Sequence, residues 1–182
     1  MNANIHFPRI NMRFVLITSL IIALLLAGFL AAMALLGPAV SNVTVLPAVS
    51  LEEAQKQVSF TVPQPKWLPD GLVLKGAHVS SPNWAQYFYS RAEGADSGLG
   101  IEVTQGASQS QYLFPDDAKQ PVKVNGQSAF CVQGSWNERQ EWISTADAGH
   151  LEWSANGFLY TIGHSGLGLA CSDLIKIAES LK

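Results

Sequence analysis

The sequence predicts an α+β domain, built on a curved antiparallel sheet of about six or seven strands, that follows one N-terminal transmembrane helix. Three observations lead to this fold class. Residues 14–36 form an uncharged apolar run, residues 72–162 alternate between apolar and polar residues with short turns between them, and helical patterns flank that region. Consecutive hairpins without crossover helices favour an antiparallel sheet, with a short N-terminal helix and a C-terminal helix packed on it.

The apolar run at 14–36 is long enough to cross a bilayer as a helix, since the hydrocarbon core is about 30 Å thick. Arg9 and Arg13 precede it and the next basic residue is Lys56, so the positive-inside rule places the N-terminus in the cytoplasm. A cleaved secretory signal is the alternative, but its apolar region usually has only about 7–15 residues. The expected organisation is a cytoplasmic tail (1–13), a transmembrane helix (14–36), a stalk (37–49) and an extracytoplasmic domain (50–182).

The distribution of charged residues along the chain indicates which partners the protein can bind. All 14 acidic residues follow the apolar run, whereas two of the 11 basic residues precede it. The exported part is therefore acidic, which excludes a basic nucleic-acid-binding domain. Besides the membrane itself, the expected partner is an envelope protein, a lipid or a cell-wall ligand.

The first helix of the domain is expected at 51–58. Ser50 and Glu53 form a capping box, in which each side chain can bond the other residue's backbone amide. Proline residues from Pro63 onward prevent the helix from continuing.

Strands are expected from Leu72 onward, and turn residues divide them. Asn125-Gly126 and Asn156-Gly157 are strong signals for two-residue hairpin turns. Residues 107–121 and the glycine-rich run 163–168 are expected to be loops. The expected strands lie at 72–80, 85–92, 99–103, 122–124, 129–136, 151–153 and 158–162, and Trp142 and Ile143 are candidates for a further one. Ser172 is expected to cap a final helix with Leu174 and Ile177 on its apolar side.

The two cysteines, Cys131 and Cys171, are both in the exported part. In an oxidising compartment they are expected to form a disulfide, and two buried free thiols are the alternative. The bond would close a loop of roughly 40 residues, worth about 4 kcal/mol in the chain-entropy model.

The sequence predicts no catalytic residue, metal ligand or cofactor, so the protein is expected not to be an enzyme. The segment from Gly163 to Leu167 departs from the G-x-S-x-G nucleophile motif because its second glycine comes one residue early. His78, His150 and His164 have no metal-ligand spacing.

Aromatic residues supply the candidate ligand site. Tyr87, Phe88 and Tyr89 place rings on both faces of one expected strand, and Trp84 comes just before it. Core packing explains such residues most simply. The alternative is an apolar or carbohydrate-binding groove on the concave face, lined by Trp84, Tyr87 and Tyr89. The C-terminal helix could also fill that concavity.

Several motifs resemble bacterial domain-of-unknown-function family 4367 over residues 50–182. They are Leu51-Glu52-Glu53-Ala54, Pro65-Lys66-Trp67-Leu68-Pro69-Asp70-Gly71, Val124-Asn125-Gly126, Trp153 with Tyr160, and the closing segment from Leu174 to Leu181. The resemblance implies an extracytoplasmic domain of the kind found in anti-sigma-factor-like membrane proteins, with an outline similar to the lipoprotein-carrier fold. It carries no catalytic residues. The expected cytoplasmic tail of residues 1–13 differs from those proteins because it is too short for a sigma-binding domain.

These observations together predict a membrane-tethered, non-enzymatic binding or sensory domain for an apolar ligand, an envelope lipid or a protein partner. A cell-wall or carbohydrate-binding module is the alternative, and a coplanar row of exposed Trp residues would favour it. A hydrolase is the third hypothesis and needs a convergent polar cluster in a cleft.

Overall fold

The computed structural model describes residues 48–91, 97–107 and 112–182. The expected cytoplasmic tail, the expected transmembrane helix and nearly all of the expected stalk lie outside these residues. Within the described part of the chain, no helix has the length and apolar character needed to cross a membrane.

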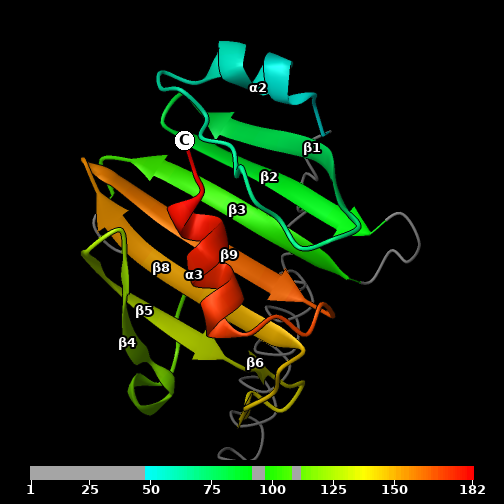
Figure 1. The fold of residues 1–182 in the computed structure, drawn as a ribbon, viewed down its shortest axis with the longest axis vertical. Coiled ribbons are helices and arrows are strands. Elements are labelled where there is room, and N and C mark those ends of the chain that lie inside the picture. The colour runs from blue at the N-terminus through cyan, green and yellow to red at the C-terminus, as the bar shows by residue number, and fades with distance from the viewer. Residues whose placement is uncertain (1–47, 92–96, 108–111) are drawn as a thin grey trace, which may run out of the picture. The chain divides into compact units, whose positions relative to one another are not determined.

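Seven strands form one sheet in the order β1-β2-β3-β9-β8-β5-β4, and every neighbouring pair is antiparallel (Figure 1). These strands are β1 (Leu72–Ser81), β2 (Trp84–Arg91), β3 (Gly98–Gln105), β4 (Gln120–Val124), β5 (Gln127–Gln133), β8 (Ala148–Ala155) and β9 (Phe158–Ser165). With two helices beside the sheet, the predicted α+β class and antiparallel sheet are confirmed. Val49 bridges Ala77, so pairing with the sheet begins just before the expected domain boundary at residue 50.

Both predicted hairpin turns occur where the sequence places them. Asn125 and Gly126 have φ angles of 47° and 80°, and Asn156 and Gly157 have 54° and 80°. Two successive positive φ angles are the mark of a type I′ turn, whose twist matches that of the flanking strands. These turns join β4 to β5 and β8 to β9.

Several strand boundaries differ from the prediction; β4, for example, begins at Gln120, inside the expected loop at 107–121. The strand expected at 129–136 is interrupted at Gly134, and β6 (Ser135–Trp136) pairs with β7 (Trp142–Ile143) as a separate two-stranded sheet. Gly134 has a φ of 148°, which a residue with a side chain rarely adopts, so the chain leaves the main sheet there. The expected loop at 163–168 begins later, because β9 continues to Ser165 with partners on both β3 and β8.

The helices are α2 (Leu51–Gln57) and α3 (Cys171–Glu179), with the 3₁₀ turn η1 (Asp116–Ala118) between strands β3 and β4. The Ser50 hydroxyl accepts a hydrogen bond from the Glu53 amide at 3.1 Å, as the capping box predicts. The expected cap of α3 at Ser172 is wrong: Ala170 is the N-cap, and its amide donates to the Asp173 carboxylate at 3.0 Å. A carboxylate in the first turn can replace a capping hydroxyl because it also interacts favourably with the helix dipole.

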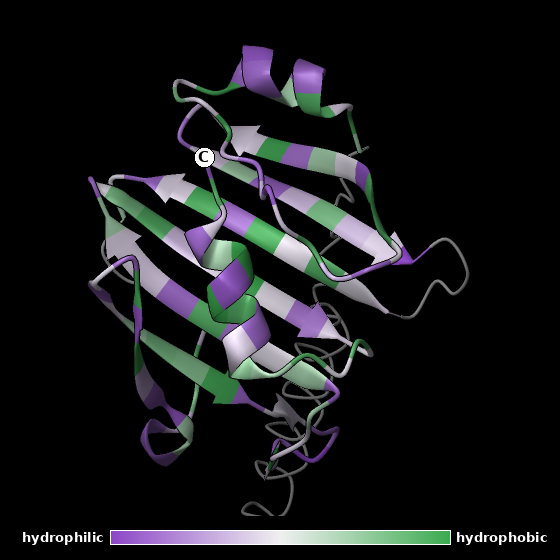
Figure 2. Cartoon of the chain, viewed as in Figure 1, coloured by the Kyte–Doolittle hydropathy of each residue, from purple (hydrophilic) through white to green (hydrophobic). Residues whose placement is uncertain are grey.

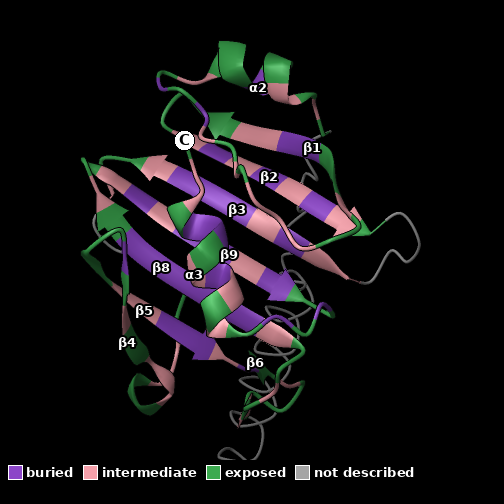
Figure 3. Cartoon of the chain, viewed as in Figure 1, coloured by how far each residue is buried: buried purple, intermediate pink, exposed green. Residues whose placement is uncertain are grey.

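The sheet has two faces, and α3 lies across one of them (Figure 1). We call this the helix face; Tyr87, Ile101, Ile162 and Leu151 lie on it in register and are fully buried. Figure 2 shows hydrophobic residues along these strands, and Figure 3 shows the buried positions concentrated on the central strands and on α3. The other face, which carries Phe88, Gly100, Gly163 and His150 in register, is called the groove face.

Cys131 and Cys171 are joined by a disulfide bond, with Cα atoms 6.1 Å apart. This separation is within the usual range for disulfides. Because Cys131 is on β5 and Cys171 is the first residue of α3, the bond attaches the start of the helix to the helix face of the sheet.

Candidate functional site

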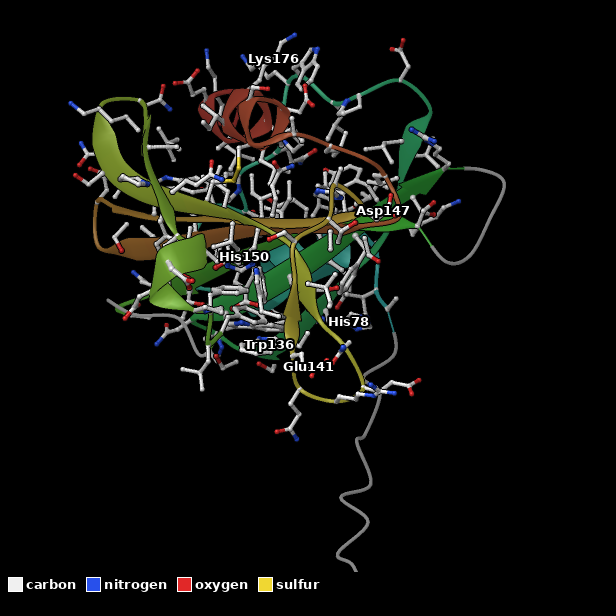
Figure 4. All side chains as sticks on the ribbon, turned by 90° about the horizontal axis from the view of Figure 1, so that it is seen from below. His78, Trp136, Glu141, Asp147, His150 and Lys176 are labelled. Atoms are coloured by element: carbon white, nitrogen blue, oxygen red, sulfur yellow. A yellow bond between two sulfur atoms is a disulfide. The ribbon has the colours of Figure 1, made fainter. Side chains whose placement is uncertain are left out.

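A groove of about 600 Å³ lies among the described residues. Residues of β1, β2, β3, β9 and β8 line it, together with the β6–β7 hairpin and the segment before η1. Five neighbouring strands span four spacings of about 4.8 Å, so the groove crosses roughly 19 Å of sheet. In the edge-on view of Figure 4, His150 and Trp136 lie on one side of the sheet and Lys176 of α3 lies on the other.

Glycine residues form the floor of the groove. Gly100 of β3 is paired with Gly163 of β9, and Gly98 lies two residues before Gly100 on the same face. A Cβ atom added at Gly100 or Gly163 would approach no other group closer than 3.7 Å. The groove is therefore open at these positions because they have no side chains, although side chains there would not clash with their neighbours.

Aromatic rings form one wall of the groove. The Phe114 ring is 4.6 Å from the His150 ring and 5.9 Å from the Trp142 ring, and Trp136 and Trp142 are 5.5 Å apart. Most of these contacts are edge-to-face or tilted, the geometry that aromatic pairs prefer. The wall is therefore a connected cluster of rings, and Tyr112 extends it by packing on His150 at 5.0 Å.

The β6–β7 hairpin contributes Trp136 and Trp142 to this wall, and two hydrogen bonds hold the hairpin in place. The Trp136 Nε1 group donates to the Leu113 carbonyl at 3.1 Å, and the Gly134 amide donates to the Ala148 carbonyl at 2.9 Å. A Cβ atom at Gly134 would lie 2.6 Å from the Trp142 ring. Only glycine lets the hairpin fold so closely onto Trp142, which places the indole in the groove wall.

Beside the wall, polar side chains are buried on the groove face. Glu102, Thr161 and Glu152 lie in register on β3, β9 and β8, and each is less than a tenth exposed. Tyr112 donates its hydroxyl to Glu102 Oε2 at 3.2 Å, and His150 Nε2 lies 3.7 Å from Glu152 Oε2. These contacts orient two rings of the groove wall, Tyr112 and His150.

Of the three residues predicted as ligand contacts, the structure brings together only Tyr87 and Tyr89, whose rings are 6.1 Å apart. Tyr87 and Tyr89 lie on the helix face and are buried, and Tyr87 donates its hydroxyl to the Pro63 carbonyl. Burial raises the pKa of Tyr87 well above its usual value and that of Tyr89 to about 12, so both hydroxyls stay protonated. Trp84 alternates with Tyr87 and lies on the other face, half-buried. Of the three, only Tyr89 borders the groove.

The glycine floor is not predicted by the sequence patterns above, although the strand glycines are a signal for it. Gly100 lies inside the strand expected at 99–103 and Gly98 comes just before it, and glycine inside a strand often marks a place where another group approaches the backbone. The sequence predicts a loop at 163–168, so it gives no indication that Gly163 lies opposite Gly100.

The other Trp residues have packing roles. Trp153 is buried and stacks on Tyr160 with the ring planes 9° apart, and the Lys176 ammonium lies 3.8 Å from the centre of the Trp67 ring. Within the described ranges, no group of three or more His, Cys, Asp or Glu side chains is placed to hold a metal ion.

Comparison with known proteins adds no relative: no protein family model, no curated protein and no solved structure matches this chain. The resemblance to family 4367 therefore stays a prediction from the motifs.

Proposed function

We propose that the domain is a membrane-tethered, extracytoplasmic binding module that holds an elongated apolar ligand, such as a lipid chain, in the groove. The observation that carries this proposal is the glycine floor beside an aromatic wall. On the groove face, Gly98, Gly100 and Gly163 leave a hollow next to Phe114 and Trp142, and filling these positions would not strain the backbone. The domain binds its ligand without transforming it.

The dimensions of the groove support a chain-like ligand. A volume of about 600 Å³ is typical of small-molecule sites, which are mostly apolar with a few polar groups. The groove runs across the strands for roughly 19 Å, so an extended chain fits it better than a compact molecule. Each methylene group that leaves water contributes about 0.8 kcal/mol to binding.

The orientation of the Trp residues favours an apolar chain over a carbohydrate. A flat sugar-binding platform needs rings that lie in one plane. Trp136 and Trp142, which both line the groove, are inclined at 75° to each other. Such an arrangement encloses a narrow ligand from two directions.

The tether is part of the same proposal. The uncharged run at 14–36, with Arg9 and Arg13 before it, anchors the chain with the domain outside the cytoplasm. Protease added to cells whose outer barrier has been opened should digest the domain while the anchor stays in the membrane fraction. Recovery of an intact soluble form that lacks the run would contradict the anchor.

A groove-filling substitution tests the binding function with a neutral ligand. Gly100→Leu places a side chain on the floor of the groove, whereas Lys123→Leu adds the same group to β4, outside the groove. The probe is brominated dodecanol, whose bromine quenches nearby Trp fluorescence, added to the full chain held in an amphipathic polymer. Quenching should saturate for the wild type and for Lys123→Leu, and should weaken strongly for Gly100→Leu. Equal quenching in all three proteins would overturn the proposal.

A further inference from the structure

The groove is chemically different at its two sides. On the side of β1 and β2, Lys75 and the Ser90 hydroxyl border it, and Ser97 follows just before β3. On the side of β8, the aromatic wall borders it, and the β6–β7 hairpin, which follows Gly134 bonded to Ala148 of β8, brings Trp136 and Trp142 there. A ligand that lies along the groove therefore meets an ammonium group at one end and indole rings at the other.

A β-bulge directs Lys75 toward the groove. The pairing of β1 with β2 shifts between Leu74, which pairs with Tyr89, and Gly76, which pairs with Phe88. Lys75 is the extra residue at this shift, and a bulge commonly re-aims a side chain in this way. Gly76, the residue after Lys75, has a φ of 153°. A Cβ atom at Gly76 would lie 3.0 Å from the Cβ atom of Ala48, so glycine leaves room for Ala48.

The charges around the groove favour a negative ligand group. Lys75 is exposed and forms no ion pair with any carboxylate of the described residues. Among the described residues that border the groove, Lys75 carries the only permanent charge, and none of them is an Asp or Glu. An anion beside Lys75 would therefore meet a positive charge without a competing carboxylate in the lining.

We propose that the ligand is a long-chain amphiphile with an anionic head group, bound with its head at Lys75 and its chain over the glycine floor toward Trp142. This inference rests on the proposed function and adds the chemical class and the direction of the ligand. The ammonium group donates charge-assisted hydrogen bonds to the head, with the hydroxyls of Ser90 and Ser97 beside it. The indole and phenyl rings cover the chain.

The head group is tested by comparing dodecanoate with dodecanol, both brominated at the chain end, on the full chain in an amphipathic polymer. Lys75→Gln should weaken dodecanoate binding by about tenfold and leave dodecanol binding unchanged, because only the charged head contacts Lys75. Lys75→Arg should retain most of the dodecanoate affinity. Lys123→Gln removes an exposed lysine of β4, outside the groove, and should change neither affinity.

The direction of the ligand is tested by moving the bromine. Dodecanoate brominated at the chain end should quench Trp fluorescence more strongly than dodecanoate brominated beside the carboxylate, since Trp136 and Trp142 lie at the far side from Lys75. The reverse order would overturn the proposed direction.

The outcomes separate the two proposals. If the wild type binds dodecanol and dodecanoate and Lys75→Gln affects neither, the anionic head is wrong while the apolar groove stands. If neither probe binds the wild type, both proposals fail.

Discussion

Gly149 and His164 lie opposite each other on β8 and β9, so closely that a Cβ atom at Gly149 would be 2.6 Å from His164 Nε2. The same Cβ would lie 3.5 Å from a Leu174 methyl group of α3. The imidazole therefore fills the place of a missing side chain on the helix face, where it is only 6% exposed. The position of Gly149 therefore requires glycine, because any side chain there would clash with the His164 ring.

Gly149→Ala should destabilise the domain by about 1–3 kcal/mol, because the new methyl group displaces the His164 ring from a packed site. Urea unfolding followed by circular dichroism measures the change. Gly163→Ala is the matched control: its Cβ would lie 3.7 Å from the nearest atom, His150 Nδ1, so its effect should be much smaller. Equal effects of the two substitutions would contradict the packing argument.

The stability of the domain should fall as the pH decreases below about 6.5. Burial lowers the pKa of His164 in the folded state, and a backbone hydrogen bond with Leu169 and the charges of Asp147 and Asp173 oppose that shift without cancelling it. Between the folded pKa and the unfolded value of 6.5, the unfolded chain binds a proton that the folded chain does not, so unfolding is favoured there. Urea unfolding at several pH values should give a flatter profile for His164→Asn than for the wild type. Parallel profiles would show that another group causes the dependence.

Removing the disulfide should lower the free energy of unfolding by about 4 kcal/mol in the chain-entropy model, since the bond closes a loop with a sequence separation of 40. The double variant Cys131→Ser/Cys171→Ser avoids a free thiol and should show this loss in urea unfolding. A reducing agent should destabilise the wild type to a similar degree and leave the double variant unchanged. A reductant effect on the double variant would mean that the loss has another cause.

Tyr87→Phe should lower the free energy of unfolding by about 1–3 kcal/mol, because the partly buried Pro63 carbonyl loses its hydrogen-bond donor, the hydroxyl of the buried Tyr87. The effect is measured by thermal or urea unfolding. Tyr160→Phe is the control, since within the described residues the Tyr160 hydroxyl forms no hydrogen bond and the ring is only partly buried. A neutral Tyr87→Phe would mean that water replaces the lost donor.

Much of the fold follows from local sequence patterns. The two Asn-Gly turns, the alternation in β2, β3, β8 and β9, and the capping of α2 by Ser50 all depend on residues close together in the chain. Local patterns are less informative where contacts between residues distant in the chain determine the structure. The break at Gly134 depends on its close contact with Trp142, and the attachment of α3 to β5 depends on the disulfide between Cys131 and Cys171; a one-dimensional pattern contains neither contact.

The sequence by itself determined the fold class, the acidic character of the part after residue 36, and the presence of aromatic residues and strand glycines. Only the tertiary structure decided which of them form a site. Tyr87 and Phe88 are neighbours in the chain but lie on opposite faces, because successive strand residues alternate. Gly100 and Gly163 are distant in the chain, and pairing of β3 with β9 places them side by side. The groove exists because strand register, which long-range packing sets, aligned the glycines on one face and brought the β6–β7 hairpin beside them.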